Sequence, residues 1–408
     1  MKILHTADWH IGKKLENFSR LAEQEMVMDE ICRVADQEEA DLVIVAGDLY
    51  DNANPGAEAN TLLYRTLHRL SNHGRRAVIA IAGNHDAPSR IDAPHPLAQQ
   101  NGIILVGDPM KELDSFKLES GLQVVNSAPG FVELKLPQYE YPVRVLLTPY
   151  ASELTLRQYL DRNNEEEELR RILDNRWTNQ CDTWCDEQGV NLLTAHLFVM
   201  QKGKEQQEEP DDERPILHIG GASPVFTENI PEAIQYVALG HLHRYQQVKG
   251  AGCPVVYSSS PLAYSFNEEN QQKYVALVEV EPGKEAEVRG IPLQQGYRLV
   301  RERFTSEQEA LEWLAQNPDC YCEITLVSDT ALSSESKQRL YSQHERLLGI
   351  IPELTGSGNN GEAEKINQID VRQDIRLLFR EYFQQKNNGQ EPDESIMQLF
   401  DEIRNTTL

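Results

Sequence analysis

The sequence lacks the features of a membrane or secreted protein. Its 408 residues contain no stretch near the roughly 20 consecutive apolar residues that a bilayer-spanning helix needs, and the start carries no apolar signal-peptide segment. The six cysteines therefore give no reason to expect disulfides. We expect a cytoplasmic protein with no membrane segment.

Positive charge is also scarce. The chain carries 39 Lys and Arg against 65 Asp and Glu, which makes the formal net charge −26. This balance argues against nucleic-acid binding by charge alone, because affinity for a phosphate chain depends on local positive charge. With 40% hydrophobic and 25% charged residues the composition is otherwise that of a globular protein. The length allows two or three domains of about 150 residues.

The sequence shows neither of two common catalytic features, a phosphate-binding loop and an activated nucleophile, and the cysteines do not form an expected metal site. The chain has no Walker-type phosphate-binding loop and no Ser or Cys nucleophile beside a base, so we expect neither nucleotide hydrolysis nor a covalent enzyme intermediate. Cys181 and Cys185 could form a metal clip, but they lie on or beside the apolar face of an expected helix. Cys320 and Cys322 lack a partner pair at zinc-finger spacing. We expect all four to be packing residues.

What is present is the alternation of an α/β layered domain. Short β-branched runs alternate with segments of helical period, and the periodicity predicts helices over 22–38, from 55 onward and over 169–184. The strands that we expect are 2–6, 41–45, 77–81, 103–106, 143–147, 191–195, 236–239, 254–257 and 273–280.

The pattern changes near residue 295, where we place a domain boundary. A strand over 297–304, a helix over 306–315 and a strand over 321–327 predict a small β-α-β capping domain within 296–355. The segment 356–370 is expected to be a linker, because it begins with a run of Gly, Ser and Asn. Within 371–408 we expect two helices, whose apolar face needs a partner surface.

Five segments place Asp, Asn or His directly after an expected strand of the large domain, 1–295. They are Asp8-Trp9-His10, Gly47-Asp48-Leu49-Tyr50-Asp51, Gly83-Asn84-His85-Asp86, Ala195-His196 and Gly240-His241-Leu242-His243. In an open α/β sheet, ligands gather beyond the carboxyl ends of the strands. These strand ends offer oxygen and imidazole ligands suited to Mn, Fe or Zn, and more of them than one ion needs. We therefore expect two ions that share one carboxylate and a water.

The order of these motifs resembles the calcineurin-like metallophosphoesterase superfamily. The motifs around Asp8, Asp48 and His241, together with Tyr257-Ser258-Ser259-Ser260-Pro261-Leu262, Ser265-Phe266 and Glu268, resemble the SbcD-type exonuclease subunits of bacterial DNA repair. The resemblance covers 1–295 closely and the remainder loosely. It implies a layered β-sandwich flanked by helices, followed by a small α+β capping domain and C-terminal helices. Ser259 stands where the family usually has Gly.

The resemblance also implies roles for the strand-end residues. Asp8, His10 and His243 would hold one ion, Asn84, His196 and His241 the second, and Asp48 would bridge both; Mn²⁺ is the metal expected from the family. His85 would protonate the leaving sugar oxygen as a general acid. Asp51 would orient His85 through a hydrogen bond that its carboxylate accepts from the ring, the alternative being a capping carboxylate before Asn52.

The function implied is that of a DNA nuclease. It would act as a 3′-to-5′ double-strand exonuclease and as a hairpin and single-strand endonuclease in DNA repair and recombination. It would be a homodimer within a heterotetramer that contains an SbcC-type coiled-coil ATPase. A phosphodiesterase or phosphatase for a small molecule and an inactive binding module are the alternatives, and the first leaves 297–408 unexplained. The expected DNA contacts are Lys13, Lys14, Arg20, Arg90 and Lys202.

Overall fold

The computed structural model describes residues 1–150, 165–204, 224–329 and 332–354, together with six single residues between 379 and 400. It divides into two units, of which the first comprises 1–327 and 332–353 and the second 328–331 and 354–408. The predicted linker 356–370 and the acidic stretch 205–212 lie outside the described residues. So do most of the predicted terminal helices, although Phe379 and Phe400 stack there with ring centroids 4.2 Å apart.

The first sheet of the large domain is built around parallel strands. Its order is β18-β17-β1-β4-β5-β6. Strands β1, β4, β5 and β6 are parallel, and β17 and β18 continue the sheet antiparallel. The bounds are β1 (Lys2–Thr6), β4 (Leu42–Ala46), β5 (Ala77–Ile81), β6 (Ile103–Val106), β17 (Tyr274–Glu279) and β18 (Glu287–Pro292). The prediction of β1, β5 and β6 is confirmed at both ends of each strand.

Helices connect these parallel strands, since a parallel pair requires a crossover. Helix α1 (Leu21–Gln37) follows β1, and helix α2 (Ala57–Leu70) follows β4, close to the predicted ranges. Their apolar faces and the outer face of the sheet form one hydrophobic cluster. The shorter elements nearby are β2 (Lys14–Leu15), β3 (Phe18–Ser19), α3 (Pro88–Asp92), α4 (His95–Ala98) and the 3₁₀ turn Gln99–Asn101.

The second sheet has the order β15-β16-β14-β11-β10-β9-β8-β7. Its central strands β10, β11, β14 and β16 are parallel, and both edges are antiparallel. The bounds are β7 (Phe116–Lys117), β8 (Gln123–Ala128), β9 (Phe131–Lys135), β10 (Val143–Thr148), β11 (Val190–His196), β14 (Tyr236–Gly240), β15 (Gln246–Val248) and β16 (Val255–Tyr257). Helix α6 (Glu165–Trp184) packs through Leu173, Trp177 and Cys181 on this sheet. A small parallel pair, β12 (Val199–Met200) and β13 (Val225–Phe226), and two 3₁₀ turns, Thr227–Asn229 and Phe266–Glu268, complete the domain.

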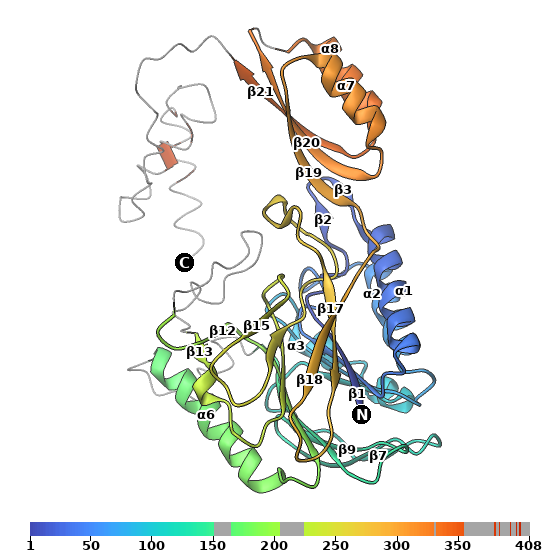
Figure 1. Cartoon of the computed structure of the whole chain (residues 1–408), viewed down its shortest axis with the longest axis vertical. Helices are drawn as coiled ribbons and strands as arrows, with labels where there is room; N and C mark the ends of the chain where they lie inside the picture. The colour runs from blue at the N-terminus through green and yellow to red at the C-terminus, as the bar shows by residue number, and fades with distance from the viewer. Residues whose placement is uncertain are drawn as a thin grey trace. The chain divides into compact units, whose positions relative to one another are not determined.

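The two sheets face each other across a shared apolar core. Ile3, Ile44 and Ile79 of the first sheet pack in one cluster with Val145 and Leu192 of the second. Both sheets are visible as a layered sandwich flanked by helices in Figure 1. The expected fold class is therefore confirmed. Among the described residues no helix is long and apolar enough to cross a membrane.

The segment 298–354, which is called the capping domain below, lies within the predicted bounds 296–355 but contains more elements than the predicted β-α-β unit. It contains β19 (Arg298–Phe304), α7 (Glu307–Gln316), β20 (Cys320–Ser328), α8 (Ser334–Gln343) and β21 (Leu347–Leu354), with the sheet order β19-β20-β21. The sequence analysis missed α8 and β21. A serine caps the N-terminus of each helix: Ser306 Oγ accepts from Glu309 N, and Ser333 Oγ accepts from Ser336 N.

Candidate metal centre

The predicted ligands meet where strands of both sheets end. Asp8 and His10 follow β1, Asp48 follows β4 and Asn84 follows β5, all in the first sheet, whereas His196 ends β11 and His241 and His243 follow β14 in the second. The ligands were expected at the edge of one open sheet, but two sheets supply them. Two hydrogen bonds join the sheets at this point: His241 N donates to Asp8 Oδ1 at 2.8 Å, and His196 Nδ1 contacts Ala46 O at 2.9 Å.

One cluster contains Asp8, His10, Asp48 and His243. Ligand atoms of the first three lie within 4.8 Å of one another, and all are buried. His10 Nε2 lies 3.1 Å from His243 Nε2 and 3.7 Å from Asp48 Oδ2. Two imidazole nitrogens on a single tetrahedral ion would be about 3.3 Å apart, given metal–nitrogen bonds of about 2.0 Å. The side chains therefore fit one ion.

A second cluster forms around His196. Its Nε2 lies 2.8 Å from Asn84 Oδ1 and 3.3 Å from Asp48 Oδ2, and its ring centroid lies 5.6 Å from that of His241. Asp48 Oδ2 is thus close to nitrogen atoms of both clusters. This position is the one expected of the bridging carboxylate.

The buried carboxylates of the site favour positive charge close to them. Burial, with the nearby Asp48, raises the pKa of Asp8, although neighbouring histidines lower it. Burial lowers the pKa of His196, but the carboxylates of Asp48 and Asp8 outweigh burial and raise it to about 9. Asp8 Oδ2 is buried and has no hydrogen-bond partner among the described residues. A buried carboxylate oxygen of this kind is costly unless a cation faces it, so the residues fit divalent ions.

The backbone of the ligand loops has positive φ angles, which are uncommon for residues other than glycine. Asp8, His10, Asp48 and His241 have φ angles of 54°, 44°, 49° and 103°. Gly83 lets two of these loops approach closely, because a Cβ there would lie 2.1 Å from Asp48 Oδ1. The glycine that precedes Asn84 is therefore part of the site's construction.

Asp86 is a site residue to which the sequence analysis assigned no role. Its buried carboxylate accepts hydrogen bonds from Leu49 N at 3.0 Å, Tyr50 N at 2.9 Å and Gly83 N at 2.9 Å. It therefore ties the loop after Asp48 to the loop that carries Asn84. The only signal in the sequence was its place at the end of Gly83-Asn84-His85-Asp86.

His85 lies beside the first cluster, but its contact with Asp51 differs from the prediction. The ring centroids of His85 and His10 are 4.8 Å apart, and His85 N donates to Asp48 Oδ1 at 2.8 Å. His85 Nδ1 contacts the main-chain oxygen of Asp51 at 2.7 Å, and the Asp51 carboxylate lies 3.6 Å from Lys13 Nζ. The bond from Nδ1 goes to the main chain, while a carboxylate oxygen of Asp51 lies within 4.8 Å of a ring nitrogen of His85. Because a carbonyl oxygen only accepts, Nδ1 carries the proton.

One of the predicted DNA contacts is contradicted by burial. Arg20 is only 1% exposed, pairs with Glu23 and donates to Ala263 O at 2.9 Å. Its guanidinium lies 4.9 Å from the Tyr321 ring centroid, so it fastens α1 to the capping domain and is not available to a phosphate.

The other four cations differ in exposure. Lys13 is buried near the site, and Arg90 is half-buried with its guanidinium 3.0 Å from Asn54 Oδ1. Lys14 and Lys202 are exposed, and Lys202 Nζ lies 3.8 Å from Glu228.

Ser259, the departure from the family pattern, adopts the conformation of a glycine. Its φ is 76°, in the left-handed region. The hydroxyl accepts from Tyr274 N at 3.0 Å and lies 3.2 Å from Tyr274 O. The side chain thus anchors the loop to β17 while the backbone keeps the conformation.

The cysteines of the capping domain are buried packing residues, as expected. Cys320 and Cys322 lie within 4.8 Å of a ring nitrogen of His344. That ring is already engaged, since Nδ1 accepts from Arg346 N at 3.1 Å and Nε2 lies 2.9 Å from Asn317 O. The apolar cluster of this domain includes both cysteines.

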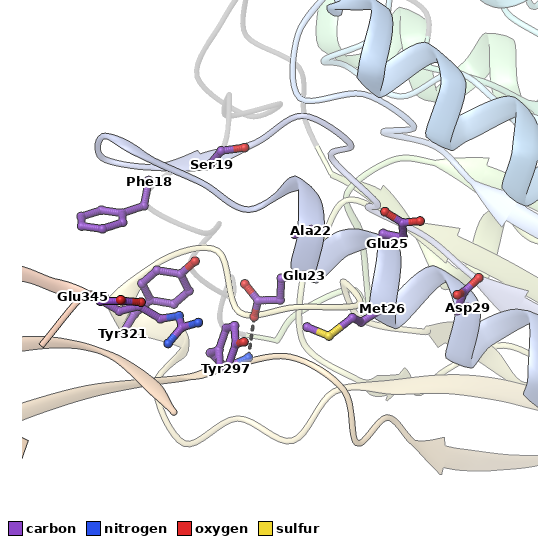
Figure 2. A pocket seen from close by; sticks show the side chains of 11 residues that line it. Phe18, Ser19, Ala22, Glu23, Glu25, Met26, Asp29, Tyr297, Tyr321 and Glu345 are labelled. Atoms are coloured by element: carbon purple, nitrogen blue, oxygen red, sulfur yellow. Dashed lines mark hydrogen bonds between the residues drawn. The ribbon is translucent and has the colours of Figure 1, made fainter. Parts of the chain in front are cut away.

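A pocket of about 650 Å³ lies elsewhere, between α1 and the capping domain. Figure 2 shows Glu23, Met26, Tyr297 and Tyr321 around it, with the bond from Tyr297 N to Glu23 at 2.5 Å. None of the metal-centre residues lines this pocket. It is therefore separate from the candidate site.

The chain is similar to several known proteins. Residues 1–245 match the family model described as calcineurin-like phosphoesterase. The chain is 35% identical over 406 residues to the SbcD subunit of the nuclease SbcCD from Bacillus subtilis (strain 168), covering 99% of this chain and 97% of that protein. Two solved structures, a Thermus thermophilus protein and a dimetal phosphatase from Danio rerio, align at TM-score 0.40 with 12% and 13% identity. Each alignment covers 71% of this chain and 98% of the other.

Proposed function

The chain belongs to the calcineurin-like phosphoesterase family, and from this membership and its site we propose that it is a metal-dependent DNA nuclease of the SbcD type. Membership makes it a hydrolase of phosphoester bonds. The observation that carries the narrower proposal is the likeness along the whole chain to a nuclease subunit, capping domain and C-terminal segment included. A small-molecule phosphoesterase has no evident need for those additions.

The proposal includes the activities and partners implied by the resemblance. The chain acts as a 3′-to-5′ double-strand exonuclease and as an endonuclease on hairpins and single strands, with Mn²⁺ as its metal. It works in the cytoplasm as a homodimer joined to an SbcC-type coiled-coil ATPase, in DNA repair and recombination. The described residues support the metal centre directly, because their oxygen and imidazole donors suit Mn²⁺.

The residues of the site have separable tasks. When bound, two divalent ions would activate a water for in-line attack and offset charge on the phosphodiester. Asp8, His10 and His243 would hold one ion, Asn84, His196 and His241 the other, and Asp48 both. Asn84 contributes a neutral oxygen, which limits the negative charge that a phosphodiester meets.

His85 is assigned the proton transfer. Its Nδ1–H is held by the main-chain oxygen of Asp51 at 2.7 Å, which fixes the ring. To act as the general acid the ring must be the imidazolium, with a second proton on Nε2; Nε2 gives this proton to the departing sugar oxygen and leaves the ring neutral with Nδ1–H still held. No side chain in this assignment forms a covalent bond to the substrate.

The net charge of −26 no longer excludes a DNA partner. Two divalent ions would bring four positive charges to the scissile phosphate. Arg20, by contrast, is removed from the set of expected phosphate contacts by its burial. We therefore expect the isolated chain to bind DNA weakly and in a salt-sensitive manner, with the ATPase partner supplying much of the affinity.

Two substrates test the proposal. The purified chain with Mn²⁺ is incubated with a 3′-labelled DNA duplex and, separately, with a chromogenic phosphodiester, and Asp48→Ala serves as the metal-deficient control. Release of labelled nucleotides by the parent and not by the control is expected. Hydrolysis of the chromogenic compound without degradation of DNA would replace the nuclease by a small-molecule phosphodiesterase.

A further inference from the structure

The two edges of the His243 ring face different surroundings. Nε2 lies 3.1 Å from His10 Nε2 within the metal centre. Nδ1 lies 3.1 Å from Glu268 Oε1, on the side away from His10. Glu268 belongs to the 3₁₀ turn Phe266–Glu268, 25 residues further along the chain, and none of the ligand roles includes it.

Glu268 is held in place by a closed and buried network. The residue is 4% exposed, and its Oε1 also accepts from Tyr264 N at 3.2 Å. Its other oxygen, Oε2, accepts a hydrogen bond from Lys273 Nζ and lies 3.5 Å from Ser260 Oγ.

Lys273 links this carboxylate to the main chain of the same histidine. Its Nζ donates to His243 O at 2.9 Å and to Ser260 Oγ at 3.0 Å, and the residue is 6% exposed. The ring and the carbonyl of His243 are therefore both fixed by one ion pair.

We propose that Glu268 is a positioning residue of the metal centre, which orients His243 by accepting its Nδ1–H while Lys273 secures the carboxylate. A carboxylate oxygen accepts from Nδ1–H and so selects the tautomer whose lone pair is on Nε2, the atom that faces His10. Carboxylate partners of this kind orient ligand histidines and raise their basicity. The inference rests on the proposed function only for the assignment of His243 as a ligand.

The assignment predicts an asymmetric effect on the two ions. His243 belongs to the cluster of Asp8 and His10, whereas His196 of the other cluster is held by the carbonyl oxygen of Ala46. Removal of Glu268 should therefore weaken the binding of one metal ion and leave the affinity for the other nearly unchanged. A carboxylate that only supported the fold of its loop would not distinguish the two ions.

Titration of metal-free protein with Mn²⁺ tests the inference. The full chain is stripped with chelator, and binding is followed by calorimetry and by the electron paramagnetic resonance of free Mn²⁺. For Glu268→Ala we expect one of two sites to weaken about 10- to 100-fold, the usual effect of losing such a partner, and the other to change less than about threefold. The control is Glu269→Gln, which alters a neighbouring half-buried carboxylate without this contact.

Two further variants separate positioning from folding. Glu268→Gln keeps an oxygen able to accept from Nδ1–H. Its Mn²⁺ affinity at the affected site should therefore fall less than that of Glu268→Ala. Lys273→Met should weaken binding at the same site, because it releases the carboxylate. The melting temperature of each metal-free variant shows whether the fold is intact, and Lys273→Met provides the binding result if Glu268→Ala does not fold.

The outcomes are distinct. Unchanged Mn²⁺ affinities in a folded Glu268→Ala or Lys273→Met variant would overturn the inference, as would equal weakening of both sites. The DNA assay is scored separately. Two Mn²⁺ ions bound with a selective loss, but no DNA degraded by the parent, would remove the nuclease function and leave the role of Glu268 standing.

Discussion

Replacing Asp86 by alanine should loosen the metal centre without removing any ligand. The carboxylate accepts from Leu49 N, Tyr50 N and Gly83 N at 2.9 to 3.0 Å, and it is a direct link between the Asp48 loop and the Asn84 loop. In Asp86→Ala these buried N–H groups lose their acceptor. The neighbouring ligands Asp48 and Asn84 should then sample more positions.

The size of the effect follows from two opposing contributions. Hydrogen bonds to a charged group contribute about 1.5–3 kcal/mol each, so three represent about 4.5–9 kcal/mol. Against this, burial and the nearby Asp48 raise the pKa of Asp86 to about 6, so the substitution also removes an unfavourable buried charge. We expect a net loss of about 2–4 kcal/mol in the free energy of unfolding of the metal-free chain.

Hydrogen exchange provides the assay, because it reports individual amides. Exchange at Leu49, Tyr50 and Gly83 should accelerate in metal-free Asp86→Ala, and Mn²⁺ affinity should fall by at least about tenfold, as when an outer-shell contact is lost. The matched control is Asp92→Ala, whose carboxylate accepts from Gly107 N at 2.9 Å and Asp108 N at 3.0 Å, away from the ligand loops. It should lose stability but bind Mn²⁺ like the parent.

Two results would refute the reasoning. Asp86→Ala could retain the parent's exchange rates at Leu49 and Tyr50, which would mean that these amides do not depend on the carboxylate. Alternatively, Asp86→Ala and Asp92→Ala could lower Mn²⁺ affinity equally. The effect would then reflect general destabilisation rather than the link between two ligand loops.

Three further predictions concern catalysis, pH and assembly. His85→Ala should bind two Mn²⁺ ions with nearly unchanged affinity but lose DNA hydrolysis, since the ring is assigned a proton transfer and no metal; near-parental activity with both ions bound would contradict this role. Burial lowers the pKa of His5 from 6.5 to about 3, so below pH 6.5 the unfolded chain binds a proton that the folded chain does not. As the pH falls from 6.5 towards 3, the free energy of unfolding of the metal-free chain should therefore decrease by up to about 1.4 kcal/mol per pH unit. Denaturant titrations at pH 7 and pH 5 should show a smaller loss of this free energy for His5→Asn than for the parent. Equal losses in the two proteins would count against the prediction. Deletion of 371–408 should leave Mn²⁺ binding intact and abolish co-purification with an SbcC-type ATPase, and recovery of the complex at full yield would place the partner surface elsewhere.

Local sequence was sufficient for the parallel strands of the first sheet and for the types of ligand. The strands Lys2–Thr6, Ala77–Ile81 and Ile103–Val106 were predicted at both ends, because short buried parallel strands appear as continuous apolar runs bounded by polar residues. The residues after these runs could be recognised because Asp, Asn and His at strand ends are few and belong to known motifs. The resemblance built on them also anticipated the layered fold.

The capping domain shows where local patterns were too weak. Helix α8 has few apolar residues, and of its residues Ser334–Gln343 only Ser336 and Leu340 are buried. With so small a buried stripe, periodicity could not separate this helix from a polar loop. The strand that follows it, β21, was missed with it.

What only the tertiary structure decided are the contacts between residues far apart in the chain. The ligands come from two sheets, Arg20 is buried between α1 and the capping domain, and His85 bonds to the main chain of Asp51. The roles of Asp86 and Glu268 also depend on contacts with residues far away in the chain. The sequence determined which side chains stand at the strand ends, because that depends on neighbours a few residues away. Which atoms then meet depends on how distant segments pack, and no local pattern contains that information.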